Sequence, residues 1–208
     1  MFQAPNDWEA YYESVFNKCN AYITTGYWEE VDKYRLNGWL NNFETDDEKY
    51  FSACLLDSLI YRSRKMVDSS FKHIASSLIP KFLLNNGIEV DGDLDSWMER
   101  LKSGSNIPFR FIAIENVDGK SGKSGSIVAR YIKESLDLAG HLTPILDKAN
   151  SIPSSVNTIV FIDDFSGTGE QFCDYYLKKV KPNVNSDLKI LYVPLAAHED
   201  AIKNINDN

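Results

Sequence analysis

The chain has 208 residues, of which 43% are hydrophobic and 25% charged, and its formal net charge is −8. This composition is typical of a globular protein and excludes a mostly disordered one. The acidic balance argues against direct binding of nucleic acid, because contacts to phosphate need a basic surface. No apolar run approaches the roughly 18 residues of a membrane span, and the N-terminus lacks the pattern of a secretory signal. The three cysteines are isolated, so we expect free thiols and a cytoplasmic protein.

The first hundred residues have helical periodicity. Helices are predicted at 6–27, 28–43, 45–66, 69–84 and 95–101. Thr45 and Glu48 have the spacing of a capping box at the start of the third of these helices. Pro80 should kink or break the fourth helix, and 85–87 (Asn-Asn-Gly) should end it.

The period changes after Pro108. Strands are predicted at 109–115, 158–163 and 188–195, with a weaker signal at 142–146, and helices at 126–134, 170–180 and 198–204. Strands that alternate with helices indicate a parallel sheet. We therefore predict an α/β fold in which an N-terminal helical region, 1–107, packs as one unit with a small parallel-sheet core, 108–208.

The most informative stretch is 157–172, NTIVFIDDFSGTGEQF. An apolar run typical of a buried parallel strand is followed by Asp163 and Asp164, which we expect to face solvent at the strand end. Ligands of parallel sheets bind at the carboxyl ends of strands, and a small-residue loop before a helix N-terminus suits a phosphate. Paired carboxylates beside it suit ribose hydroxyls or a phosphate-bound Mg²⁺. The candidate phosphate loop consists of Ser166, Gly167, Thr168 and Gly169. The same pattern is also compatible with a plain strand-to-helix junction.

This stretch resembles the signature of type I phosphoribosyltransferases. Asp163, Asp164, Thr168 and Gly169 match the signature, whereas Ser166, Gly167 and Gln171 depart from it. DDFSGTGEQF is more similar still to phosphoribosyltransferase-like proteins of bacterial conflict and anti-phage operons, some of which lie beside retron reverse transcriptases. The resemblance implies that the loop holds the 5-phosphate of phosphoribosyl pyrophosphate and that the acidic pair faces the ribose.

A second glycine-rich loop, 116–125, follows the strand at 109–115. By itself it is compatible with an exposed turn. In the family that the chain resembles, the loop at this place binds pyrophosphate. The resemblance therefore implies a pyrophosphate site made of Lys120, Ser121, Gly122, Lys123 and Ser124.

The resemblance covers about residues 108–208 and implies a phosphoribosyltransferase-like core that lacks its last strand. An uncovered sheet edge would favour association of copies. The implied function is binding of a phosphoribosyl, pyrophosphate-type or nucleotide ligand with Mg²⁺ as cofactor, in an effector of anti-phage defence. The implied partners are operon-encoded defence proteins such as a reverse transcriptase. The implied activity is phosphoribosyl transfer or hydrolysis of an N-glycosidic nucleotide bond.

Two other interpretations stay open. The altered loop residues and the missing strand are compatible with a nucleotide-sensing or scaffold module without catalysis. Gly122, Lys123 and Ser124 also match the end of a Walker A motif, in which case 158–164 would be the Walker B strand of a P-loop phosphotransferase. A P-loop, however, needs glycine at the position of Val117.

Overall fold

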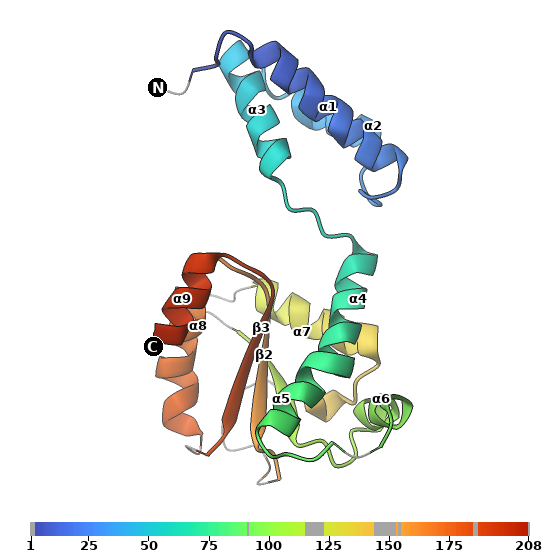
Figure 1. Cartoon of the computed structure of the whole chain (residues 1–208), viewed down its shortest axis with the longest axis vertical. Helices are drawn as coiled ribbons and strands as arrows, with labels where there is room; N and C mark the ends of the chain where they lie inside the picture. The colour runs from blue at the N-terminus through green and yellow to red at the C-terminus, as the bar shows by residue number, and fades with distance from the viewer. Residues whose placement is uncertain are drawn as a thin grey trace. The chain divides into compact units, whose positions relative to one another are not determined.

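The structure is a computed structural model that describes residues 3–90, 92–114, 123–143, 153, 155–184 and 187–207. The chain divides into two compact units, Met1–Val67 and Asp68–Asn208 (Figure 1). The second unit includes the helices between 68 and 107, because these helices pack with the sheet. Trp97, for example, lies 6.1 Å from Phe109 of the first strand, measured between ring centroids.

The first unit contains the helices α1 (Trp8–Thr24), α2 (Lys33–Leu40) and α3 (Asp46–Ser58). The capping box predicted for α3 is confirmed. The Glu48 N–H donates to Thr45 Oγ1 over 3.3 Å, and the Thr45 N–H donates to Glu48 Oε2 over 3.0 Å. Apolar faces of the three helices and the turn before α2 enclose a small core that includes Val15, Cys19, Trp28, Leu36, Leu40 and Ala53.

Two helix boundaries predicted in this unit are wrong. α2 begins at Lys33 and not at residue 28, because the Asp32 carboxylate caps it by accepting from the Arg35 N–H over 2.7 Å. α3 ends at Ser58 and not at residue 66. Leu59 and Ile60 continue the apolar pattern in sequence, but their side chains are 53% and 72% exposed, so the pattern there does not mark a buried face.

The helix α4 (Arg64–His73) begins in the first unit and ends in the second, where the π-helix Ile74–Leu78 and α5 (Ile79–Asn85) follow it. Pro80 has no N–H to donate to the preceding turn, and the chain accommodates this by widening into the π-helix. The predicted stop is confirmed: Gly87 has φ +73°, and the Ile88 N–H donates to the Leu83 carbonyl over 2.9 Å. α6 (Leu94–Ser103) follows, and Gly104 ends it in the left-handed conformation.

Three parallel strands form one sheet in the order β1-β2-β3, which confirms the α/β prediction. The strands are β1 (Phe109–Ala113), β2 (Thr158–Ser166) and β3 (Lys189–Ala197). In the described part of the chain no strand pairs with the outer side of β3, as expected for a core without its last strand. The weaker strand signal is at 142–146. Leu142 ends a 3-10 turn, Gly140–Leu142, and 144–146 lie outside the described residues.

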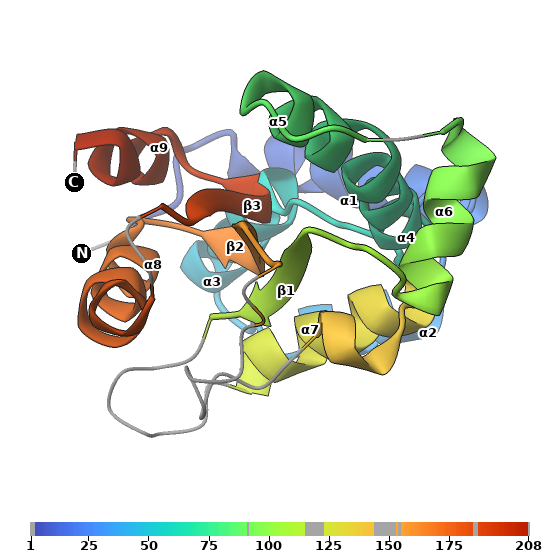
Figure 2. The ribbon, with the colours of Figure 1, turned by 90° about the horizontal axis from the view of Figure 1, so that it is seen from below.

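Helices cover both faces of the sheet (Figure 2). One face packs on α8 (Glu170–Tyr175), which continues as the π-helix Tyr176–Val180, and on α9 (Glu199–Asp207). The helices from α4 to α6 lie on the opposite side, and α7 (Lys123–Leu136) packs along β1 and β2. None of the described helices has the length and hydropathy that a membrane crossing requires.

Candidate functional site

The acidic pair lies within β2, because this strand runs further than predicted. Pairing with β3 continues from Asp163, opposite Pro194, to Ser166, opposite Ala197. Successive side chains of a strand point to opposite faces. Asp163 is consequently buried, at 5% exposure, while Asp164 is exposed. The expectation that both carboxylates face solvent is therefore wrong for Asp163.

Asp163 is held by two hydrogen bonds inside the protein. Its Oδ1 accepts from the Asp164 N–H over 3.0 Å, and its Oδ2 accepts from the Tyr192 hydroxyl over 3.1 Å. Burial, assisted by a hydrogen bond to the Asp164 carboxyl group, raises the pKa of Asp163 to about 6. Burial likewise raises the pKa of Tyr192, against a hydrogen bond with the Ser166 hydroxyl that lowers it.

The candidate phosphate loop therefore has an inner and an outer side. The Ser166 side chain is 5% exposed and is turned toward Tyr192, while Thr168 is exposed. Thr168 Oγ1 accepts from the Glu170 N–H over 3.4 Å at the start of α8. A ligand that approaches this loop from solvent would thus meet the Thr168 hydroxyl and the Asp164 carboxylate.

α9 fixes the loop from behind. The Asn204 side-chain amide donates to the Thr168 carbonyl over 2.8 Å. Gly169 has φ +78°, and a Cβ added there would lie 2.9 Å from Ile205 Cγ1 and 3.0 Å from the Ala201 carbonyl oxygen. The loop conformation therefore requires glycine at residue 169, both for its backbone angle and for the close approach of α9.

The start of α7 meets the same edge of the sheet. β1 and β2 are parallel neighbours, as predicted, so their carboxyl ends lie together. α7 begins three residues before its predicted start, and a Cβ added at Gly125 would lie 2.1 Å from the Ile114 carbonyl oxygen. The first turn of α7 therefore sits directly against the end of β1. It includes Lys123 and Ser124, whose side chains are not among those described, and the predicted residues Lys120, Ser121 and Gly122 lie outside the described residues.

Two residues of the site were missed by the sequence analysis. Tyr192 comes from β3 and lies 29 positions from Asp163, and Asn204 comes from α9 and lies 36 positions from Thr168. Tyr192 did carry a signal, because it and Lys189 are the two residues with a polar end in the run LKILYVPL. Asn204 had no comparable signal, because a polar residue near the end of a helix is ordinary.

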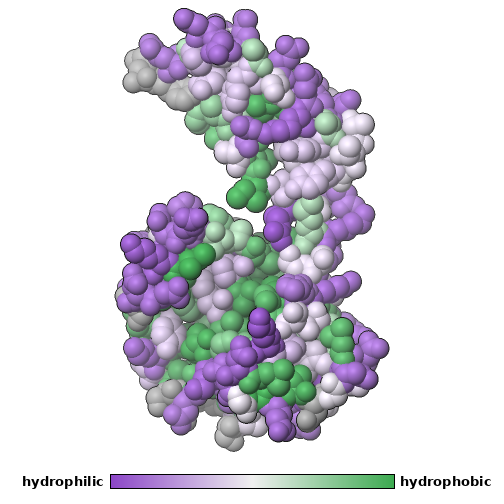
Figure 3. All heavy atoms as spheres, viewed as in Figure 1, coloured by the Kyte–Doolittle hydropathy of each residue, from purple (hydrophilic) through white to green (hydrophobic). Residues whose placement is uncertain are grey.

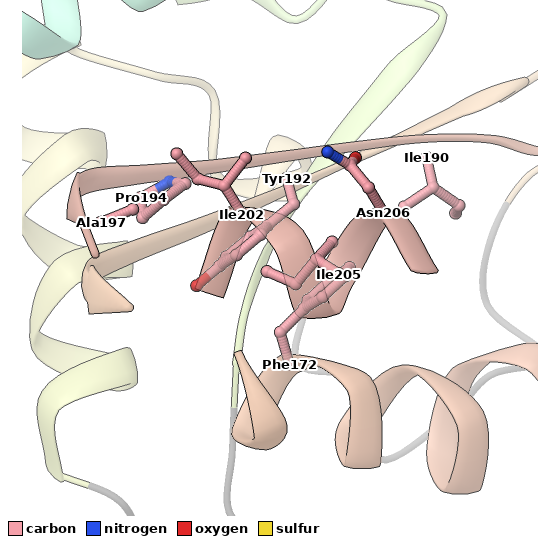
Figure 4. Close-up of a pocket in the computed structure, with 8 residues that line it drawn as sticks. All are labelled: Phe172, Ile190, Tyr192, Pro194, Ala197, Ile202, Ile205 and Asn206. Carbon is pink, nitrogen blue, oxygen red and sulfur yellow. The ribbon is translucent and has the colours of Figure 1, made fainter. Parts of the chain in front are cut away.

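A cavity of about 330 Å³ lies behind Tyr192, between β3 and α9 (Figure 4). Its lining is largely apolar and includes Phe172, Pro194 and Ile205. The Tyr192 ring stacks on Phe172 with 4.1 Å between centroids and 3° between planes. Tyr192 thus separates this cavity from the Asp163 carboxyl group.

The donor set suits Mg²⁺ if a phosphorylated ligand supplies further oxygens. Among the described residues there is no cluster of three or more His, Cys, Asp or Glu side chains able to hold a metal ion. Mg²⁺ commonly uses one or two carboxylates together with phosphate oxygens and water. The exposed Asp164 carboxylate fits that role, whereas both oxygens of Asp163 already accept hydrogen bonds.

Comparison with known proteins identifies the family of the chain. No curated protein and no solved structure matches the chain. A family model described as PRTase-CE matches residues 36–208, which extends the likeness from the sheet back through the helices to α2. Since these residues are most of the sequence, the chain belongs to the PRTase-CE family of phosphoribosyltransferase-like proteins.

Proposed function

We propose that the protein binds a 5-phosphoribosyl ligand, with a pyrophosphate or nucleotide leaving group, at the edge where β1 and β2 end. The observation that carries the proposal is the arrangement at the end of β2. There Asp164 and Thr168 are both exposed beside a helix start, in a member of a phosphoribosyltransferase-like family. Family membership also favours this function over that of a P-loop phosphotransferase.

In this proposal the 5-phosphate lies on the loop of Ser166, Gly167, Thr168 and Gly169. Its contacts are the Thr168 hydroxyl and the loop's N–H groups, because the Ser166 hydroxyl is turned inward. Of the acidic pair, Asp164 faces the ribose hydroxyls and Mg²⁺, and Asp163 lies buried behind it. The leaving phosphates lie on Lys120, Ser121, Gly122, Lys123 and Ser124.

The reaction that such a site supports is substitution at the anomeric carbon of the ribose. The bond to the leaving group breaks as the acceptor bond forms, and the sugar carries positive charge in between. A carboxylate held nearby stabilises that charge electrostatically. With pyrophosphate as the leaving group and a base or nucleic acid as the acceptor, this is phosphoribosyl transfer. With a nucleotide as the ligand, its nucleobase as the leaving group and water as the acceptor, it is hydrolysis of the N-glycosidic bond.

Calorimetric titration with phosphoribosyl pyrophosphate and with ATP, each with Mg²⁺, tests the proposal. Thr168→Val keeps the side-chain size but removes the exposed hydroxyl. It should weaken the phosphoribosyl ligand by about 1.5–3 kcal/mol, the range for a hydrogen bond to a charged group. ATP binding that survives Thr168→Val and is lost in Lys123→Ala would instead identify a P-loop phosphotransferase.

A sensing or scaffold module without catalysis is a second candidate function. Both oxygens of Asp163 accept hydrogen bonds within the protein. This favours the second candidate, because the Asp163 carboxyl group is then less available to stabilise a cationic transition state. Titration followed by a turnover assay separates the two functions. A sensor binds the ligand and releases no pyrophosphate, whereas an enzyme consumes the ligand and releases pyrophosphate.

The biological setting that we propose is an effector of anti-phage defence in the bacterial cytoplasm, acting with operon-encoded partners such as a reverse transcriptase. The likeness of DDFSGTGEQF to proteins of such operons supports it. Plaque counts on cells that carry the operon, with the wild-type protein or with Thr168→Val, test both the setting and its dependence on the site. Equal protection by both would remove the site from the defence function.

A further inference from the structure

Tyr192 connects three elements that surround the candidate site. It belongs to β3, its ring lies flat against Phe172 of α8 (Figure 4), and its hydroxyl donates to Asp163 of β2. Ser166 at the end of β2 also hydrogen-bonds the hydroxyl. The ring is therefore oriented by stacking, and the hydroxyl is aimed at the Asp163 carboxyl group.

The contact continues from Asp163 to its neighbour. While Oδ2 of Asp163 accepts from Tyr192, Oδ1 accepts from the Asp164 N–H, so the carboxyl group bridges β3 and the Asp164 backbone. The Asp164 carboxylate in turn accepts from the Phe165 N–H over 2.9 Å. The direction of the exposed carboxylate thus depends on a backbone segment that Asp163 and Tyr192 hold from inside.

We propose that Tyr192 is a positioning residue and that the two aspartates have different tasks. Tyr192 and Asp163 together fix the backbone at Asp164, and we call these two residues the clamp. Asp164 then presents its carboxylate to the ribose and to Mg²⁺. The second half of this statement rests on the proposed function, whereas the clamp itself does not.

The clamp is tested in the ligand-free protein with Tyr192→Phe, which keeps the ring stack and removes the hydroxyl. Tyr176→Phe is the matched control, because Tyr176 stacks on the same Phe172 at 6.0 Å and 13°. We expect amide hydrogen exchange at Asp164, followed by NMR, to become about tenfold faster in Tyr192→Phe and to stay unchanged in Tyr176→Phe, since loss of one such hydrogen bond is worth about that factor. Unchanged exchange in Tyr192→Phe would overturn the clamp. Tyr192→Leu, which also lacks the hydroxyl and leaves the Asp163 acceptor of the Asp164 N–H in place, should give at least the same increase and replaces Tyr192→Phe if that variant does not fold.

The division of tasks is tested by titration with phosphoribosyl pyrophosphate, with and without Mg²⁺. Tyr192→Phe should bind about tenfold more weakly and still respond to Mg²⁺, whereas Asp164→Asn should lose the response to Mg²⁺. Wild-type affinity in Tyr192→Phe, or a Mg²⁺ response lost in Asp163→Asn and kept in Asp164→Asn, would overturn the division. If the wild-type protein does not bind the ligand, the proposed function fails with the second half of the inference, and amide exchange still decides the clamp.

Discussion

Asp163 and Asp164 are identical in chemistry and adjacent in sequence, yet their environments are opposite. One points into the layer between the sheet and α8 and the other into solvent, because side chains alternate along β2. At the scale of the residue, the two carboxyl groups therefore differ. The inner one, of Asp163, has a raised pKa, and the outer one, of Asp164, is available to a ligand.

The raised pKa of Asp163 predicts a change of stability with pH. The pKa rises from 3.8, the ordinary value, to about 6 in the folded protein, so the folded state holds the proton more tightly than the unfolded state does. The resulting stabilisation is fully present below pH 3.8 and is lost as the pH rises through about 6. Between about pH 4 and 7, this titration should lower the unfolding free energy of the wild-type protein by about 2–3 kcal/mol, the size that a shift of this order implies. Asp163→Asn should remove that part of the pH dependence.

Urea denaturation across this pH range, followed by fluorescence, measures the effect. Asp174→Asn is a suitable control, because Asp174 is an exposed aspartate of α8. Identical curves for Asp163→Asn and the wild-type protein would show that the Asp163 carboxyl group titrates alike in the folded and unfolded states.

At the scale of elements, the two glycines of the loop have different tasks. Gly169 has a positive φ and lies against α9, whereas a Cβ at Gly167 would approach Phe165 Cε1 no closer than 3.4 Å. Gly169→Ala should therefore lower the unfolding free energy by about 1–3 kcal/mol, the range for a strained backbone position. Gly167→Ala should change it by less than about 0.5 kcal/mol.

These two variants form a matched pair, because they introduce the same methyl group two residues apart. Urea denaturation of both compares them directly. If both variants are destabilised equally, the start of α8 and α9 do not approach as closely as the structure shows. If neither variant is destabilised, the loop rearranges freely.

At the scale of the whole molecule, the main feature is the outer edge of β3, with which no strand among the described residues pairs. Figure 3 shows hydrophobic side chains gathered over this part of the second unit, and β3 is only half-buried along most of its length. The Lys189 N–H donates to the carbonyl of Asn157, the residue just before β2, and so points toward that strand. By alternation, the N–H groups of Ile190 and of every second residue after it point outward. Pro194 occupies one of these outward positions and has no N–H to offer. It is thus placed where a proline hinders pairing with another strand.

Pro194→Val should accordingly increase self-association. The change restores an outward N–H and adds a residue with high strand propensity. Sedimentation velocity over a series of protein concentrations measures it, and Pro182→Val serves as the control, because Pro182 lies in an exposed 3-10 turn away from the strand. If Pro194→Val sediments like the wild-type protein at every concentration, the outward N–H positions do not control association.

Features that depend on neighbouring residues could be predicted from the sequence. The Thr45 capping box and the Gly87 stop need a few adjacent residues, and the buried strands are visible because a parallel strand covered on both faces is continuously apolar. The same reasoning placed the loop after Asp164 at the carboxyl end of a strand. Parallel pairing of β1 and β2 then follows from the alternation of strands and helices.

Features that depend on contacts between distant segments could be learned only from the folded chain. The register of β2 and β3 places Tyr192 beside Asp163 and extends β2 past the acidic pair, and neither is visible in a local pattern. The approach of α9 brings Asn204 to the Thr168 carbonyl and makes glycine necessary at residue 169. An apolar pattern shows which side chains avoid water, but not which partners they meet, and so the burial of Asp163 could be learned only from the packed sheet.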